Sequence, residues 1–167
     1  SWKAFVDRME KDHAPLLEQL RLRRAVGMDI GWDILAPLVR IPHDDLYRPP
    51  LHEHGTHVAG ILAGGWIEDQ GPTFADTDEP GMMGICPEML LVDIRAFDAQ
   101  GCGREDTVIE AIDLVRFMNR ESGQPTIHGV NLSLSVTHDV QAYGCGQTPV
   151  CNACNELVRS GVTVVAA

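Results

Sequence analysis

The sequence predicts an α/β protein with a mainly parallel sheet that is covered by helices on both faces. Apolar segments typical of buried strands recur at 89–97, 130–135 and 162–167, and segments with helical spacing lie between them, at about 106–120 and 150–159. A strand–helix–strand order favours parallel pairing, because the crossover helix returns the chain to the end of the sheet from which it started. The prediction therefore follows from the alternation of element types.

The helix expected at about 106–120 has one apolar side, and Asp106 or Thr107 is expected to cap its N-terminus. This apolar side carries Val108, Ile109, Ile112, Val115 and Phe117. Gly161 is placed to end the helix at about 150–159, because glycine readily adopts the left-handed conformation that closes many helices.

The first half of the chain shows less regular patterns. Residues 2–24 have mostly helical spacing, which predicts an amphipathic helix interrupted near Pro15. Residues 25–53 hold several prolines and are expected to be mostly loop. A helix is expected from His54 to about Ala63, and the segment 64–84, rich in glycine, proline and acids, is expected to be an exposed loop.

Composition excludes some functions and leaves others open. With 167 residues the chain is one domain or part of one, and its net charge of -11 and pI near 4.9 argue against a nucleic-acid partner. No apolar run has the length of a membrane span, and no pattern indicates a cellular compartment. The five cysteines cannot all pair within the chain, and their state stays open: Cys86, Cys102, Cys145, Cys151 and Cys154.

The octet at 54–61, H-G-T-H-V-A-G-I, places a histidine where a loop becomes a helix. Gly55 leaves room there for a substrate or another backbone segment. This octet resembles the histidine motif of the subtilases, the subtilisin-like serine peptidases. The resemblance implies that His54 is the general base of an Asp-His-Ser triad, with His57 in a supporting role.

Three further segments resemble subtilases in the same order along the chain. Residues 84–97 are similar to the family's G-x-A-P segment and the strand after it, with Cys86 in place of the alanine. Residues 131–135 are similar to the N-x-S-L-G strand, with Ser135 in place of the glycine, which would narrow the specificity pocket. The resemblance implies that a peptide substrate adds as a strand between two backbone segments. These segments consist of Gly101, Cys102 and Gly103 on one side, and Ser133, Leu134 and Ser135 on the other.

The other triad members are harder to locate. The family's serine motif, G-T-S-M-A-x-P, does not occur in the 167 residues, and the strand at 161–167 resembles the one that continues into the oxyanion asparagine. Asp29 is the nearest match to the family's D-[ST]-G aspartate, although Ile30 replaces the hydroxyl residue, and an aspartate before Ser1 is the alternative. We therefore expect 51–167 to be the central, C-terminally truncated part of a three-layer subtilisin-like domain, with 1–50 as an insertion or N-terminal segment.

Two other functions stay open at this point. His52, His54 and His57 form an H-x-H-x-x-H run that could bind zinc in a metallohydrolase, although Thr56 stands where such enzymes carry an aspartate. The second alternative is a non-catalytic, subtilase-like binding domain.

A cysteine half-site formed by Cys145, Cys151 and Cys154 would need a fourth ligand such as Cys102 or His138. The peptidase reading requires no cofactor, and the resemblance allows calcium without indicating a site.

Overall fold

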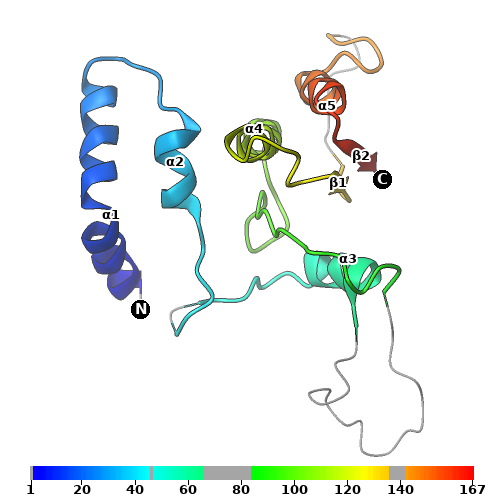
Figure 1. Ribbon diagram of the computed structural model, residues 1–167, viewed down its shortest axis with the longest axis horizontal. Coiled ribbons are helices and arrows are strands. Elements are labelled where there is room, and N and C mark those ends of the chain that lie inside the picture. Colours follow the sequence, from blue (N-terminus) through cyan, green and yellow to red (C-terminus); the bar gives the residue numbers. More distant parts are fainter. Residues whose placement is uncertain (1, 46, 66–83, 136–141) are drawn as a thin grey trace, which may run out of the picture.

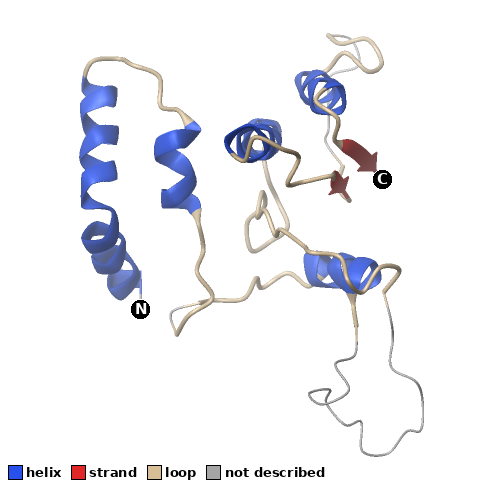
Figure 2. Cartoon of the chain, viewed as in Figure 1, coloured by secondary structure: helices blue, strands red, loops and turns tan. Residues whose placement is uncertain are grey.

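The computed structural model describes residues 2–45, 47–65, 84–135 and 142–167. The elements follow one another as five helices and two strands within these ranges (Figures 1 and 2): α1 (Trp2–Ala25), α2 (Trp32–Val39), α3 (His54–Ala63), α4 (Glu105–Glu121), β1 (Gly129–Leu132), α5 (Pro149–Arg159) and β2 (Thr163–Ala166). No helix in the described part of the chain is both long enough and apolar enough to cross a membrane.

The two strands form a parallel sheet, as the sequence predicts. β1 and β2 pair with Val130 opposite Val164, and α5 provides the crossover between them. The buried cluster lies between this sheet and the helices α4 and α5, and it consists of Val108, Ile112, Val115, Leu157 and Val162. On the other face of the sheet Val165 is 55% exposed, so the described residues show helices covering one face and not both. The α/β class is compatible with this arrangement, and the three-layer arrangement is not complete in it.

The C-terminal end of α5 is closed as expected. Gly161 has a φ of 92°, in the region that favours glycine. Its amide donates to the Val158 carbonyl at 2.9 Å, and the Val162 amide donates to the Leu157 carbonyl at 3.4 Å. These are the two hydrogen bonds of a Schellman motif, and they turn the chain from α5 into β2.

The cap expected at the start of α4 was wrong. The N-cap residue is Arg104, whose side chain does not cap the helix. Asp106 lies inside the first turn, accepts from the Thr107 amide at 2.9 Å and pairs with Arg104 at 2.8 Å. The hydrogen bond from Arg104 lowers the pKa of the Asp106 carboxyl below its ordinary value. The carboxylate therefore lies near the positive end of the helix dipole from within the helix.

The N-terminal region differs from its prediction at one element. α1 is kinked at His13, which has non-helical φ and ψ two residues before Pro15, as expected from the missing proline N–H. α2, however, lies in a segment predicted to be loop. Its Ile34 is only 1% exposed, and α2 packs against both α1 and α4 (Figure 1). Tertiary burial therefore stabilises an eight-residue helix that contains Pro37.

The predicted strand at 89–97 is also a correction. The structure assigns no strand there, because within the described residues no neighbouring segment forms a hydrogen-bonded ladder with it. Several of its apolar side chains are exposed, including Leu90 at 94%. Most of the predicted loop at 64–84 lies outside the described residues.

Candidate active site

His54 is the first residue of α3, and it is exposed. The first N–H groups of a helix have no partner within the helix. Here the His54 amide donates to Nδ1 of His52 at 3.3 Å. The two rings lie edge to face with their centroids 6.3 Å apart. His52 therefore provides the local contact that holds the start of the helix.

The other end of α3 is held by the segment 84–86. The amides of Gly84, Ile85 and Cys86 donate to the carbonyls of Gly64, Ile61 and Leu62 at 2.6, 2.9 and 2.8 Å, respectively. Two of these carbonyls belong to the last turn of α3, which has no further helical donors. The approach at Gly84 is close, since an added Cβ would lie 2.6 Å from the Gly64 nitrogen. Only glycine allows this contact, so the segment that resembles G-x-A-P anchors the histidine helix.

The imidazole of His54 reaches the segment that follows β1. Its Nε2 nitrogen lies 2.9 Å from the backbone oxygen of Ser133. The Ser133 hydroxyl accepts from the side-chain amide of Asn131 at 2.9 Å, and Leu134 packs against the buried cluster. Ser135 is exposed. The histidine motif and the 131–135 segment, both singled out in the sequence, are thus in direct contact.

The loop 98–103 is shaped by the carboxylate of Asp98. One of its oxygens accepts from the amides of Gln100 and Cys102, both at 2.9 Å, and the Asp98 amide donates to the Cys102 carbonyl at 2.8 Å. Gly101 has a φ of 74°, which favours glycine at this turn. The side chain of Cys102 is exposed. The predicted glycine-containing loop is confirmed, and its conformation is held by hydrogen bonds within it.

The same loop contacts the histidine segment through His52. A Cβ added to Gly101 would lie 3.0 Å from Cδ2 of the His52 ring. The absence of a side chain at 101 therefore permits the loop to lie against the imidazole. His52 joins the two features: its ring lies next to Gly101, and its Nδ1 accepts from the His54 amide.

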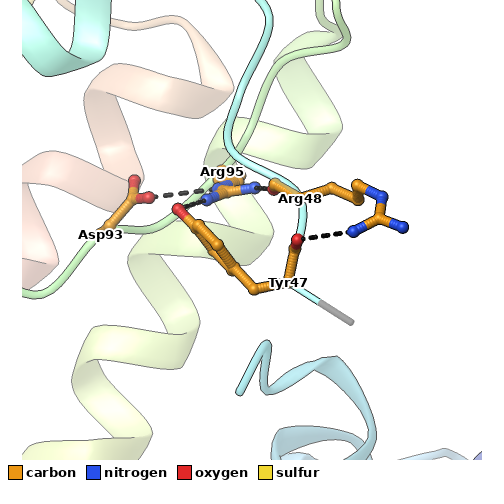
Figure 3. Close-up of polar contacts among 4 residues, drawn as sticks. All are labelled: Tyr47, Arg48, Asp93 and Arg95. Atoms are coloured by element: carbon orange, nitrogen blue, oxygen red, sulfur yellow. Dashed lines mark hydrogen bonds and ion pairs between the residues drawn. The ribbon is translucent and has the colours of Figure 1, made fainter. Parts of the chain in front are cut away.

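A polar cluster that sequence reasoning missed holds the chain before His52 (Figure 3). Arg95 donates to the Tyr47 hydroxyl at 2.7 Å, to the Arg48 carbonyl at 3.1 Å and to the Asp93 carboxylate at 3.1 Å. Burial opposes the charge of Arg95, but the hydrogen bonds to Asp93 and Tyr47 outweigh it and raise the pKa of the guanidinium. The sequence signal that could have found this cluster is Arg95 itself, an arginine inside the mostly apolar segment 89–97.

Comparison with known proteins identifies the family. Residues 42–167 match the subtilase family, which is most of the chain. The chain belongs to the subtilase family. A thermophilic serine proteinase of Bacillus sp. (strain AK1) is 33% identical to it over 126 residues, which are 74% of this chain and 25% of that protein. An intracellular serine protease of Paenibacillus polymyxa is 37% identical over 59 residues, which are 35% of this chain and 15% of that protein.

This subtilase chain spans a quarter or less of the length of these two curated relatives. No solved structure matches it. The matched range includes His54, Gly101 and Ser133, and also Tyr47 and Arg95. It does not include α1 or α2, which precede residue 42.

Asp29 does not lie with the rest of the candidate site. It is exposed in the connection between α1 and α2, outside the range matched to the subtilases. Figure 1 draws this connection well apart from α3. Within the described residues, no hydrogen bond or ion pair joins Asp29 to His54. The structure therefore brings His54 together with Ser133 and, through His52, with Gly101, but not with Asp29.

The metal alternatives find no geometric support in the described residues. His52, His54 and His57 are not arranged as a ligand set, and no group of three or more His, Cys, Asp or Glu side chains is placed to hold a metal ion in these ranges. His138 lies outside the described residues. All five cysteines are free. Burial, together with the neighbouring Cys151, raises the pKa of the Cys154 thiol, as expected for a thiol packed along a helix.

Proposed function

We propose that this subtilase chain forms the central part of a serine endopeptidase, in which His54 is the general base of an Asp-His-Ser triad. The observation that carries the proposal is the 2.9 Å contact between Nε2 of His54 and the Ser133 oxygen. This contact supports the proposal because it sets the His54 imidazole against the backbone that we expect to bind peptide. The named relatives, a serine proteinase and a serine protease, support the same reaction class.

In the proposed mechanism His54 takes part in two transfers of the same proton. Nε2 accepts the proton of the serine hydroxyl as its oxygen attacks the scissile carbonyl, and then donates it to the leaving amine. A carbonyl oxygen only accepts hydrogen bonds, so Nε2 carries the proton in its contact with Ser133. That contact must therefore open before Nε2 can act as a base toward a serine.

The substrate would bind as an extended strand between 101–103 and 133–135. Backbone hydrogen bonds would hold it, as in other cases of strand addition. Gly103 suits this edge because a Cβ there would lie 2.3 Å from the Phe97 ring, so that no side chain fits. Ser135, where subtilases carry glycine, would narrow the primary pocket and favour small substrate side chains. We also propose that the complete domain has the three-layer subtilisin-like arrangement, with 1–50 as an additional segment.

The 167 residues lack the G-T-S-M-A-x-P motif, so we expect them not to hydrolyse peptides by themselves. The triad aspartate is assigned to no residue of the described site, and Asp29 would have to move to reach His54. The mechanism needs no cofactor. It needs a serine nucleophile and an aspartate at the two imidazole nitrogens.

The experiment compares the product of the whole gene with its His54→Ala variant. We expect the former to hydrolyse a peptide library and to react with a fluorophosphonate, and His54→Ala to lose both properties. His128→Ala, a change at an exposed histidine outside the site, is the matched control and should retain both. A whole-gene product that binds peptide but neither reacts nor cleaves would instead identify a non-catalytic binding domain.

A further inference from the structure

The segment that leads into His54 and the segment that leads into Gly101 are joined at two places. One is the cluster around Arg95, and the other is the contact of the His52 ring with Gly101. Arg48 precedes His54 by six residues, and Arg95 precedes Gly101 by six residues. The cluster of Tyr47, Arg48, Asp93 and Arg95 is therefore a common anchor for the two segments. From this anchor they run toward the two parts of the candidate active site.

All three nitrogens of the Arg95 guanidinium donate hydrogen bonds in this anchor. Nη2 donates to the Tyr47 hydroxyl, Nη1 to the Arg48 carbonyl and Nε to Asp93 (Figure 3). The Arg48 side chain in turn donates to the Tyr47 carbonyl at 3.0 Å. The Arg95 side chain is 24% exposed. A planar fork with fixed donor directions holds several partners in one geometry, which a lysine ammonium does not.

The anchor restricts how the two segments can move relative to each other. Between residues 42 and 53 the described chain has no helix or strand of its own to fix its path. The backbone has a limited reach per residue, so fixing Tyr47 and Arg48 limits the positions available to His52 and His54. Fixing Arg95 has the same effect on the loop that carries Gly101.

We propose that Arg95 is a positioning residue of the endopeptidase, which holds the separation between His54 and the backbone edge 101–103. The proposal rests on the proposed function for its catalytic meaning. Arg95 touches neither His54 nor Gly101 in the contacts described above, and it acts through the Tyr47–Arg48 backbone and through the backbone that runs from Arg95 to Gly101. Its loss would let the base and the substrate edge shift relative to each other.

The kinetic test uses the whole-gene product with Arg95→Met, Arg95→Lys and Tyr47→Phe. A displacement of about 1 Å can cost about a hundredfold in rate, so we expect Arg95→Met to lower kcat/KM by roughly ten- to a hundredfold. We expect KM to rise as well, because the edge that binds the substrate moves. A variant that only unfolds part of the sample lowers the apparent kcat and leaves KM unchanged. Arg95→Lys should lie between Arg95→Met and the unmodified protein.

Arg116→Met is the matched control. Arg116 is likewise a partly exposed arginine with more than one partner: it pairs with Asp113 at 3.2 Å and with Glu156 at 2.8 Å, joins α4 to α5, and is 34% exposed. The KM of Arg116→Met should stay within about twofold of that of the unmodified protein, because surface ion pairs contribute little. Equal effects of Arg116→Met and Arg95→Met on KM would overturn the proposal while leaving the peptidase assignment intact.

A second measurement separates this proposal from the proposed function. NMR spectra of the same proteins report the His52 ring and the Gly101 amide directly, with or without hydrolysis. Arg95→Met and, to a smaller extent, Tyr47→Phe should shift both signals, whereas Arg116→Met should leave them in place. Unchanged His52 and Gly101 signals in Arg95→Met overturn the positioning role, as do shifted signals with unchanged kinetics. Absence of hydrolysis in the unmodified protein overturns the proposed function alone, and the spectra then decide whether Arg95 holds the two segments.

Discussion

Nε2 of His54 and the carbonyl oxygen of Ser133 lie 2.9 Å apart, although the two residues are separated by 79 positions in the chain. The contact joins the start of α3 to the backbone that follows β1. It occupies the nitrogen that a triad would need as its proton acceptor. In this arrangement Nε2 of His54 is engaged by Ser133, so it is not free to accept a proton.

This contact predicts the tautomer of His54. In the neutral form of the ring, the proton of His54 should reside on Nε2, because the Ser133 carbonyl offers only an acceptor. Nitrogen-15 NMR of the histidine side chains distinguishes the two tautomers. His52 should show the same tautomer, since its Nδ1 accepts from the His54 amide. A His54 ring protonated mainly on Nδ1 would show that the contact with Ser133 is not formed in solution.

Replacement of Leu157 should be strongly destabilising. Its side chain is 0% exposed in the cluster formed by α4, α5 and β2. Leu157→Ala leaves a cavity there and should lower the free energy of unfolding by about 2–5 kcal/mol. Denaturant titration measures the change. Val158→Ala, at the next position and 52% exposed, should alter the free energy by no more than about 0.5 kcal/mol. Similar values for both variants would contradict the assigned core.

The turn after α5 should tolerate only glycine at 161. Gly161→Ala places a Cβ on a residue with a φ of 92°, and we expect a loss of about 1 kcal/mol or more in the free energy of unfolding. Gly60→Ala is the matched control. Gly60 lies within α3 with no atom within 4 Å of an added Cβ, so alanine should stabilise that helix by up to about 1 kcal/mol. Thermal or denaturant unfolding should therefore give a lower free energy of unfolding for Gly161→Ala and a higher one for Gly60→Ala.

The thiol of Cys154 should react more slowly than the exposed cysteines. Burial and the nearby Cys151 raise its pKa, which keeps the thiol protonated, and the thiolate is the reactive form. Iodoacetamide at about pH 8, near the ordinary thiol pKa, should label the exposed residues first: Cys86, Cys102 and Cys145. Mass spectrometry of the labelled peptides gives the order.

The same shift has a consequence for stability. A pKa that is raised in the folded state stabilises the fold fully below the ordinary thiol pKa, and this contribution is lost as the pH rises through the raised value. Cys154→Ser should reduce this alkaline dependence. Rapid labelling of Cys154 in folded protein would show that its side chain is not packed as described.

The elements that the sequence predicted well are those with local signals. α4 and α5 follow from apolar spacing, the end of α5 from Gly161, and the start of α3 from the histidine octet. α2 was missed because its eight residues carry a proline, and its stability depends on burying Ile34 against other helices. The segment 89–97 was wrongly predicted as a strand, because an apolar run indicates burial but does not supply a hydrogen-bonding partner.

The sequence by itself determined the family, the histidine motif and the order of the segments that resemble those of subtilases, because each depends on residue types at short, fixed spacing. Only the tertiary structure decided that His54 meets Ser133, that His52 lies on Gly101 and that Arg95 holds Tyr47 and Arg48. These contacts join residues that lie 47 to 79 positions apart, and no local sequence pattern predicts them. Chain topology brings such residues together, and for that reason the relative positions of His54, Gly101 and Ser133 could be read only from the fold.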